Sequence, residues 1–163
     1  MLYFAYGSNL LPKQMQRRCP GARAVGRGKL DDWQLIFNTR GAANIVPKQG
    51  ELIYGALWRF LPHHVGLMDL WEGVAHGVYR RAWVRVEQSD EKTRTAITYI
   101  SDFTAPGHGR PHYITQAILP GADHFQLPDE FRTEIASWLP DRPIGASRPY
   151  LGRKAPRRPT SSK

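Results

Sequence analysis

Short apolar runs recur along the chain, and most of them end at glycine, proline or polar residues. Over residues 33–38 the side chains alternate, so that Trp33, Leu35 and Phe37 share one side. Such a period of two is typical of a strand with one buried face. With the apolar runs elsewhere, the pattern predicts a turn at residues 48–50, a short extended piece at 44–47, and strands at 2–6, 22–30, 33–38, 52–60, 78–86 and 93–100.

Apolar residues spaced three or four positions apart predict a helix that begins at Pro62, a residue suited to the first helical turn. The helix is expected to stop at Glu72 and Gly73, since glycine readily adopts the left-handed conformation that ends helices. Further helices are predicted at residues 12–18, 110–119 and 127–139. Strands and helices do not alternate, which argues against a doubly wound parallel sheet. We therefore predict an α+β fold, a small mixed β-barrel or curled sheet with flanking helices.

The length of 163 residues fits one domain, and the hydrophobic share of 41% is enough for a packed core. The net charge of +9 is unevenly distributed: residues 148–163 hold six basic side chains and no acidic one, whereas the rest carries 17 basic and 14 acidic side chains. We predict a domain over residues 1–147 and a disordered, proline-containing basic tail over 148–163. Such a tail is either a solvated extension or an anchor to nucleic acid or an anionic surface. No nucleic-acid-binding motif supports the second interpretation, so nucleic acid is not an expected partner.

A single cysteine, Cys19, excludes an internal disulfide framework and indicates a reducing compartment. Arg17 and Arg18 beside it favour a lower thiol pKa, but a lone cysteine before Pro20 is interpreted as a bystander. No apolar stretch reaches the roughly 18 residues of a membrane span. The first residues lack the charged region of a signal peptide. We expect a cytoplasmic protein without a membrane partner, and its oligomeric state stays open.

Histidines are the only candidate cluster of metal ligands, and their spacing is poor. His63 and His64 are adjacent, while His108 and His112 flank a proline that breaks helical presentation. All four are interpreted as surface or loop histidines. The segment Gly26–Lys29 lacks the spacing of a phosphate-binding loop. We expect no metal site here.

The segment Tyr6-Gly7-Ser8-Asn9-Leu10 follows a buried strand directly. A sharp turn at this place can point successive backbone N–H groups outward as a site for a carboxylate or phosphate. An ordinary strand-to-turn junction is the alternative.

A second segment, residues 68–80, places Glu72 between Trp71 and Gly73-Val74 at the end of an apolar helix. Apolar surroundings raise the pKa of a carboxyl, which a general base working near neutral pH requires. A solvated glutamate at the helix end is the alternative.

Together, Tyr-Phe-Ala-Tyr-Gly-Ser-Asn-Leu at residues 3–10 and Met-Asp-x-x-Glu-Gly-Val-x-x-Gly-x-Tyr at residues 68–79 resemble the gamma-glutamylcyclotransferase-like family. The resemblance covers roughly residues 2–140. It implies that the loop Tyr6, Gly7, Ser8, Asn9 and Leu10 binds the α-carboxylate of a γ-glutamyl group. It also implies that Glu72 is the acid/base, that Tyr113 borders the pocket, that Tyr79 supports Glu72, and that Gly73 and Gly77 keep the backbone close to the substrate.

The implied reaction is an intramolecular attack of the substrate's α-amine on its δ-carbonyl, which releases 5-oxoproline and an amine and needs neither a metal nor an organic cofactor. The leaving group stays open: a γ-glutamyl dipeptide, amine or metabolite presents the same head group. His108, Arg110 and His112 at the pocket exit would favour an acidic one. A non-catalytic γ-glutamyl-binding or interaction module of the same fold is the alternative function.

Overall fold

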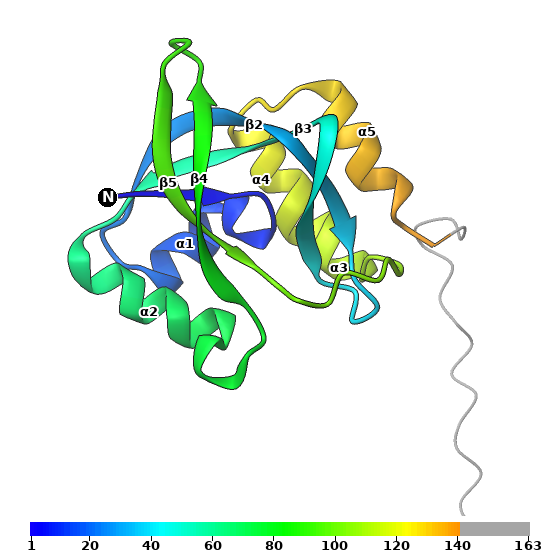
Figure 1. Ribbon diagram of the computed structural model, residues 1–163, viewed down its shortest axis with the longest axis horizontal. Coiled ribbons are helices and arrows are strands. Elements are labelled where there is room, and N and C mark those ends of the chain that lie inside the picture. The colour runs from blue at the N-terminus through cyan, green and yellow to red at the C-terminus, as the bar shows by residue number, and fades with distance from the viewer. Residues whose placement is uncertain (141–163) are drawn as a thin grey trace, which may run out of the picture.

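The computed structural model describes residues 1–140, in which five strands close into a barrel (Figure 1). Around the barrel the strand order is β1-β3-β2-β4-β5. Every neighbouring pair is antiparallel except β1 and β5, which are parallel. The bounds are β1 Leu2–Ala5, β2 Arg23–Phe37, β3 Ala43–Arg59, β4 Arg80–Gln88 and β5 Thr93–Ile100. The predicted mixed barrel is confirmed, and the sheet is closed rather than open.

Strands β2 and β3 are each longer than predicted. Breaks were expected near residues 31–32 and 48–51, but both strands continue through them. The pairing changes register there, from Asp31 opposite Leu52 to Trp33 opposite Pro47. Asp32 has a positive φ of 63°, and its Oδ1 accepts a hydrogen bond from Gly50 N–H at 2.9 Å. The predicted turn at residues 48–50 was therefore wrong: the chain bulges there and stays in β3.

Helices lie outside the barrel, with α1 and α2 near one another and α3 to α5 on another side (Figure 1). Their bounds are α1 Pro12–Arg18, α2 Pro62–Glu72, α3 Pro111–Tyr113, α4 Leu119–His124 and α5 Asp129–Ser137. Two single 3₁₀ turns accompany the first two helices: η1 Ser8–Leu10 precedes α1, and η2 Val74–His76 follows α2. A π-helical segment, η3 Ile114–Ile118, joins α3 to α4. The helical segment predicted from residue 110 thus extends to His124. Its π-turns come just before Pro120, which lacks the N–H that an α-helix would use.

His64 corrects the expectation of surface histidines, because its side chain is completely buried in α2. Its Nδ1 accepts a hydrogen bond from Leu61 N–H at 3.1 Å, and its Nε2 lies 2.9 Å from Pro20 O. Both ring nitrogens therefore have backbone partners, and these hydrogen bonds offset the cost of removing the polar ring from water. His63 next to it is exposed, as predicted.

Within residues 1–140, no helix combines the length and apolar character that crossing a membrane requires. The predicted domain limit at residue 147 and the basic tail at 148–163 lie outside the described residues.

The end of β1, from which the loop at residues 6–10 departs, is fixed by a close approach to β3. A Cβ at Gly55 would clash with the carbonyl oxygen of Ala5 and would lie 2.6 Å from the ring of Phe4. Glycine at this position allows β1 to pack against β3 where the strand ends.

Gly55→Ala is expected to destabilise the fold by about 1–3 kcal/mol, because the added methyl group overpacks a rigid contact. Gly66→Ala is the matched control: Gly66 lies on the exposed side of α2 with open space around it, and alanine favours the helix by up to about 1 kcal/mol. Urea unfolding monitored by circular dichroism measures both changes. Equal stability of Gly55→Ala and the unsubstituted chain would contradict the packing described here.

Candidate functional site

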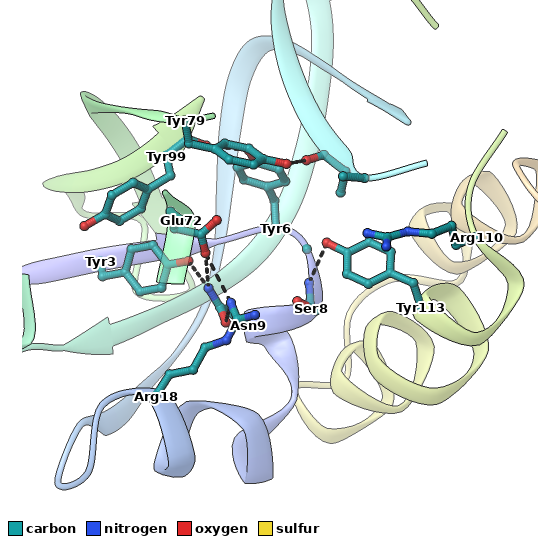
Figure 2. Close-up of a pocket in the computed structure, with 13 residues that line it drawn as sticks. Tyr3, Tyr6, Ser8, Asn9, Arg18, Glu72, Tyr79, Tyr99, Arg110 and Tyr113 are labelled. Atoms are coloured by element: carbon teal, nitrogen blue, oxygen red, sulfur yellow. Dashed lines mark hydrogen bonds and ion pairs between the residues drawn. The ribbon is translucent and has the colours of Figure 1, made fainter. Parts of the chain in front are cut away.

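A polar pocket opens beside the end of β1 (Figure 2). The lining side chains come from β1, η1, α1, α2, β5 and the segments around residues 42, 79 and 110. They include five tyrosines, two arginines and a single carboxylate: Tyr3, Tyr6, Gly7, Ser8, Asn9, Arg18, Ala42, Ala43, Glu72, Tyr79, Tyr99, Arg110 and Tyr113.

Glu72 is held at one carboxylate oxygen by two donors (Figure 2). Asn9 Nδ2 donates to Glu72 Oε1 at 3.0 Å, and Arg18 Nη1 donates to the same oxygen at 3.2 Å. Arg18 Nη1 also donates to Asn9 Oδ1 at 2.9 Å, so the three side chains form a closed network. Among the described residues no hydrogen bond reaches Oε2, which leaves this oxygen available to a ligand in the pocket.

Burial raises the pKa of Glu72 above its usual range, while the charge of Arg18 and the hydrogen bond from Asn9 lower it. The side chain is only 14% exposed, so the alternative of a solvated glutamate does not apply. The direction of the pKa shift is the predicted one. The surroundings differ from the prediction, however, because polar groups contact the carboxylate directly. A raised pKa makes the carboxylate a stronger base, which favours acceptance of a proton.

Gly73 and Gly77 shape the backbone that follows Glu72. Both have a φ of 65°, a left-handed conformation that other residues adopt only with strain. Gly73 N–H bonds back to Asp69 O and Leu70 O, which ends α2 directly after Glu72. Neither glycine lines the pocket, so their role in this structure is to end the helix and turn the chain.

The loop after β1 forms η1. Its backbone closes through Leu10 N–H, which donates to Gly7 O at 2.9 Å. A helical turn does not use its own first N–H groups, and Ser8 N–H instead donates to Tyr113 Oη at 3.4 Å. Gln14 of α1 donates to Ser8 Oγ at 2.6 Å and holds the loop from outside. Ser8 N–H therefore points into the pocket, where its partner is a side-chain hydroxyl rather than a backbone carbonyl.

Tyrosine side chains line much of the pocket. Burial raises the pKa of Tyr113 and of Tyr79, so both are uncharged donors and acceptors at neutral pH. Tyr79 Oη donates to Ala43 O at 2.8 Å, and within residues 1–140 no hydrogen bond joins Tyr79 to Glu72. Tyr3 Oη accepts a hydrogen bond from Asn9 Nδ2 at 2.8 Å.

The structure brings most of the predicted site residues to one pocket: Tyr6, Gly7, Ser8, Asn9, Glu72, Tyr79 and Tyr113. Leu10 is placed elsewhere, since its side chain is fully buried against Gly121 of α4. Of the three residues considered for the exit, Arg110 lines the pocket, whereas His108 and His112 do not.

Sequence reasoning missed Tyr3, Arg18 and Tyr99 as pocket residues. Arg18 was considered only as a neighbour of Cys19, whose pKa burial in fact raises to about 11. No local pattern singles out Arg18, because its partner Glu72 lies on another helix.

Arg18→Gln is expected to raise the pKa of Glu72 further, because the substitution removes a positive charge that stabilises the carboxylate. A ¹³C NMR titration of the glutamate carboxyl carbons measures this pKa, with the signal assigned by its loss in Glu72→Gln. Arg17→Gln is the matched control, since Arg17 also lies near the Trp71 ring, at 5.7 Å, but forms no ion pair with Glu72. An unchanged pKa in Arg18→Gln would contradict the electrostatic role of Arg18.

Comparison with known proteins identifies relatives across nearly the whole chain. A sequence profile of the AIG2-like family matches residues 52–135, a range that contains Glu72 but begins after the loop at residues 6–10. Gamma-glutamylcyclotransferases of mouse and human are each 29% identical over 150 residues, spanning 86% of this chain and 79% of theirs.

Solved structures show the same likeness. A gamma-glutamyl cyclotransferase superposes with a TM-score of 0.80 at 27% identity, covering 96% of this chain and 94% of its own. An uncharacterized human protein superposes with a TM-score of 0.80 at 28% identity, covering 91% and 93%. The match to the family profile, over residues 52–135, spans more than half of this chain, and the chain therefore belongs to the AIG2-like family.

Proposed function

We propose that this protein is a gamma-glutamylcyclotransferase, which converts a γ-glutamyl amide into 5-oxoproline and a free amine. The observation that carries the proposal is the buried carboxyl of Glu72, held at one oxygen by Asn9 and Arg18 in a pocket that the turn Ser8–Leu10 also lines. The likeness to gamma-glutamylcyclotransferases in sequence and in structure supports it.

The head group of the substrate is proposed to bind with its α-carboxylate at the turn Gly7-Ser8-Asn9. Ser8 N–H, now bonded to Tyr113 Oη, supplies a donor for one carboxylate oxygen. Tyr6 and Tyr113 border this end of the pocket. The α-amine then faces the free oxygen of Glu72.

In the reaction, the nitrogen of the α-amine attacks the δ-carbonyl carbon and forms the five-membered ring. Glu72 takes the proton that the attacking nitrogen loses. The bond between the δ-carbon and the leaving nitrogen breaks, and Glu72 returns the proton to that nitrogen. One carboxyl therefore serves both steps, and the products are 5-oxoproline and the amine.

Two physical effects supply the rate. Folding the substrate so that its amine meets its own carbonyl makes the step intramolecular, with effective molarities on the order of 10⁵–10⁸ M for well-oriented groups. A free α-amine has a pKa of about 8 and is mostly protonated at neutral pH. The second effect is acid–base catalysis by a positioned carboxyl, which accepts the proton of the attacking amine and contributes about 10²–10⁴-fold.

Glu72→Gln is expected to lower 5-oxoproline release from γ-glutamyl-alanine by at least about 100-fold, because an amide neither accepts nor returns the proton. The measurement is 5-oxoproline formation by liquid chromatography over a panel of γ-glutamyl amino acids and amides. Glu130→Gln, an exposed position on α5, is the matched control and should keep full activity.

Circular dichroism and binding of the substrate to Glu72→Gln separate loss of chemistry from loss of fold. A wild-type protein that binds γ-glutamyl compounds without releasing 5-oxoproline would instead be the non-catalytic binding module. Near-normal activity of Glu72→Gln would overturn the assignment of Glu72.

A further inference from the structure

The pocket has a second cation, Arg110, on the side away from Arg18 (Figure 2). Arg18 is neutralised by its ion pair with Glu72 at 3.2 Å. Arg110 forms no ion pair with any acidic side chain of residues 1–140. Its side chain extends toward the pocket and ends over Tyr113 (Figure 2). The pocket therefore presents one uncompensated positive charge near its mouth.

The backbone fixes the position of this charge. Arg110 N–H and Arg110 Nε both donate to Gly41 O, at 3.4 and 3.3 Å. The guanidinium carbon lies 5.4 Å from the centre of the Tyr113 ring. Gly41 has a φ of 71°, and a Cβ there would lie 2.7 Å from Arg110 Cγ, so glycine is what lets the two segments approach. With Nε engaged, the terminal nitrogens of the guanidinium stay available as donors in a fixed fork.

Charge balance indicates what this fork binds. The lining residues contribute one carboxylate, Glu72, and two guanidinium groups. A γ-glutamyl amino acid carries two carboxylates and one ammonium at neutral pH, whereas a γ-glutamyl amine lacks the second carboxylate. With the α-carboxylate at Ser8 and the scissile carbonyl near Glu72, the leaving group extends toward the exposed side of the pocket, where Arg110 lies.

We propose that Arg110 binds a carboxylate of the leaving group and thereby makes the protein selective for γ-glutamyl amino acids and peptides over γ-glutamyl amines. This inference rests on the proposed cyclotransferase function. Arg110 acts as a specificity-determining residue: bidentate hydrogen bonds from a planar guanidinium to a carboxylate give both affinity and orientation. The α-carboxylate of the head group is the competing source of the same chemistry, and the experiment separates the two.

The test compares γ-glutamyl-alanine with γ-glutamyl-alaninamide, which has nearly the same shape but no carboxylate on the leaving group. Values of kcat/KM for 5-oxoproline release are measured for the wild type, Arg110→Gln and Arg110→Lys. Arg110→Gln is expected to reduce kcat/KM about tenfold more for γ-glutamyl-alanine than for γ-glutamyl-alaninamide, the size of one charge-assisted hydrogen bond at a partly exposed site. Arg110→Lys retains the charge without the fork and should keep part of the preference.

Arg40→Gln is the matched control. Arg40 is also exposed and lies two positions before Ala42, which lines the pocket, but its guanidinium carbon lies 3.7 Å from the centre of the Phe103 ring and it does not line the pocket itself. The wild-type preference should persist in Arg40→Gln. If Arg40→Gln removes the preference as fully as Arg110→Gln does, the effect is one of net charge and the proposed contact is wrong.

Two further outcomes overturn the inference in different ways. Equal losses of Arg110→Gln on both substrates would mean that Arg110 binds the head group or shapes the pocket, and the leaving-group assignment would fall while the cyclotransferase function stands. Release of 5-oxoproline from neither substrate by the wild type would refute the proposed function itself, and the selectivity with it.

Discussion

Burial of the Glu72 carboxylate is the constraint around which the pocket is organised. Moving an ionised carboxyl from water into the protein interior costs several kcal/mol of solvation free energy, and only well-placed partners offset that cost. Here Asn9 and Arg18 supply them, at 3.0 and 3.2 Å from the same oxygen. Because Asn9, Arg18 and Glu72 belong to η1, α1 and α2, those three segments must meet at this point. The geometry of the loop after β1 thus depends on a charge that lies more than sixty positions further along the chain.

Asn9 bridges the two halves of the site through the two ends of its amide. The nitrogen donates to Glu72 and Tyr3, and the oxygen accepts from Arg18 and Gln14. An aspartate could not donate to Glu72, and its charge would repel the carboxylate. The amide therefore links Glu72 to the turn Ser8–Leu10 without adding charge, and it fixes the position of one relative to the other.

Local sequence patterns located the features that depend on neighbouring residues. The helix ending at Glu72 and Gly73 was predicted from apolar spacing and a glycine, and the strands from alternation. The features that were missed depend on distant partners. Arg18 belongs to the site because α1 packs beside α2. The buried ring of His64 has Pro20 O as the partner of its Nε2, and the bulge at residues 48–51 requires Asp32 across the sheet. Apolar periodicity predicts local secondary structure and gives no information about such distant pairings.

The parallel pairing of β1 with β5 also determines when the pocket comes into being. Closing the barrel joins Tyr3 to Ile97, and the wall opposite Ser8 comes from Tyr113. Contacts between positions so far apart in the chain cost loop entropy before they contribute stability, which slows folding. During synthesis the turn that carries Ser8 leaves the ribosome first, and Tyr113, which faces it, follows about one hundred positions later. A nascent chain therefore completes this pocket only after Tyr113 has been synthesised and β5 has paired with β1.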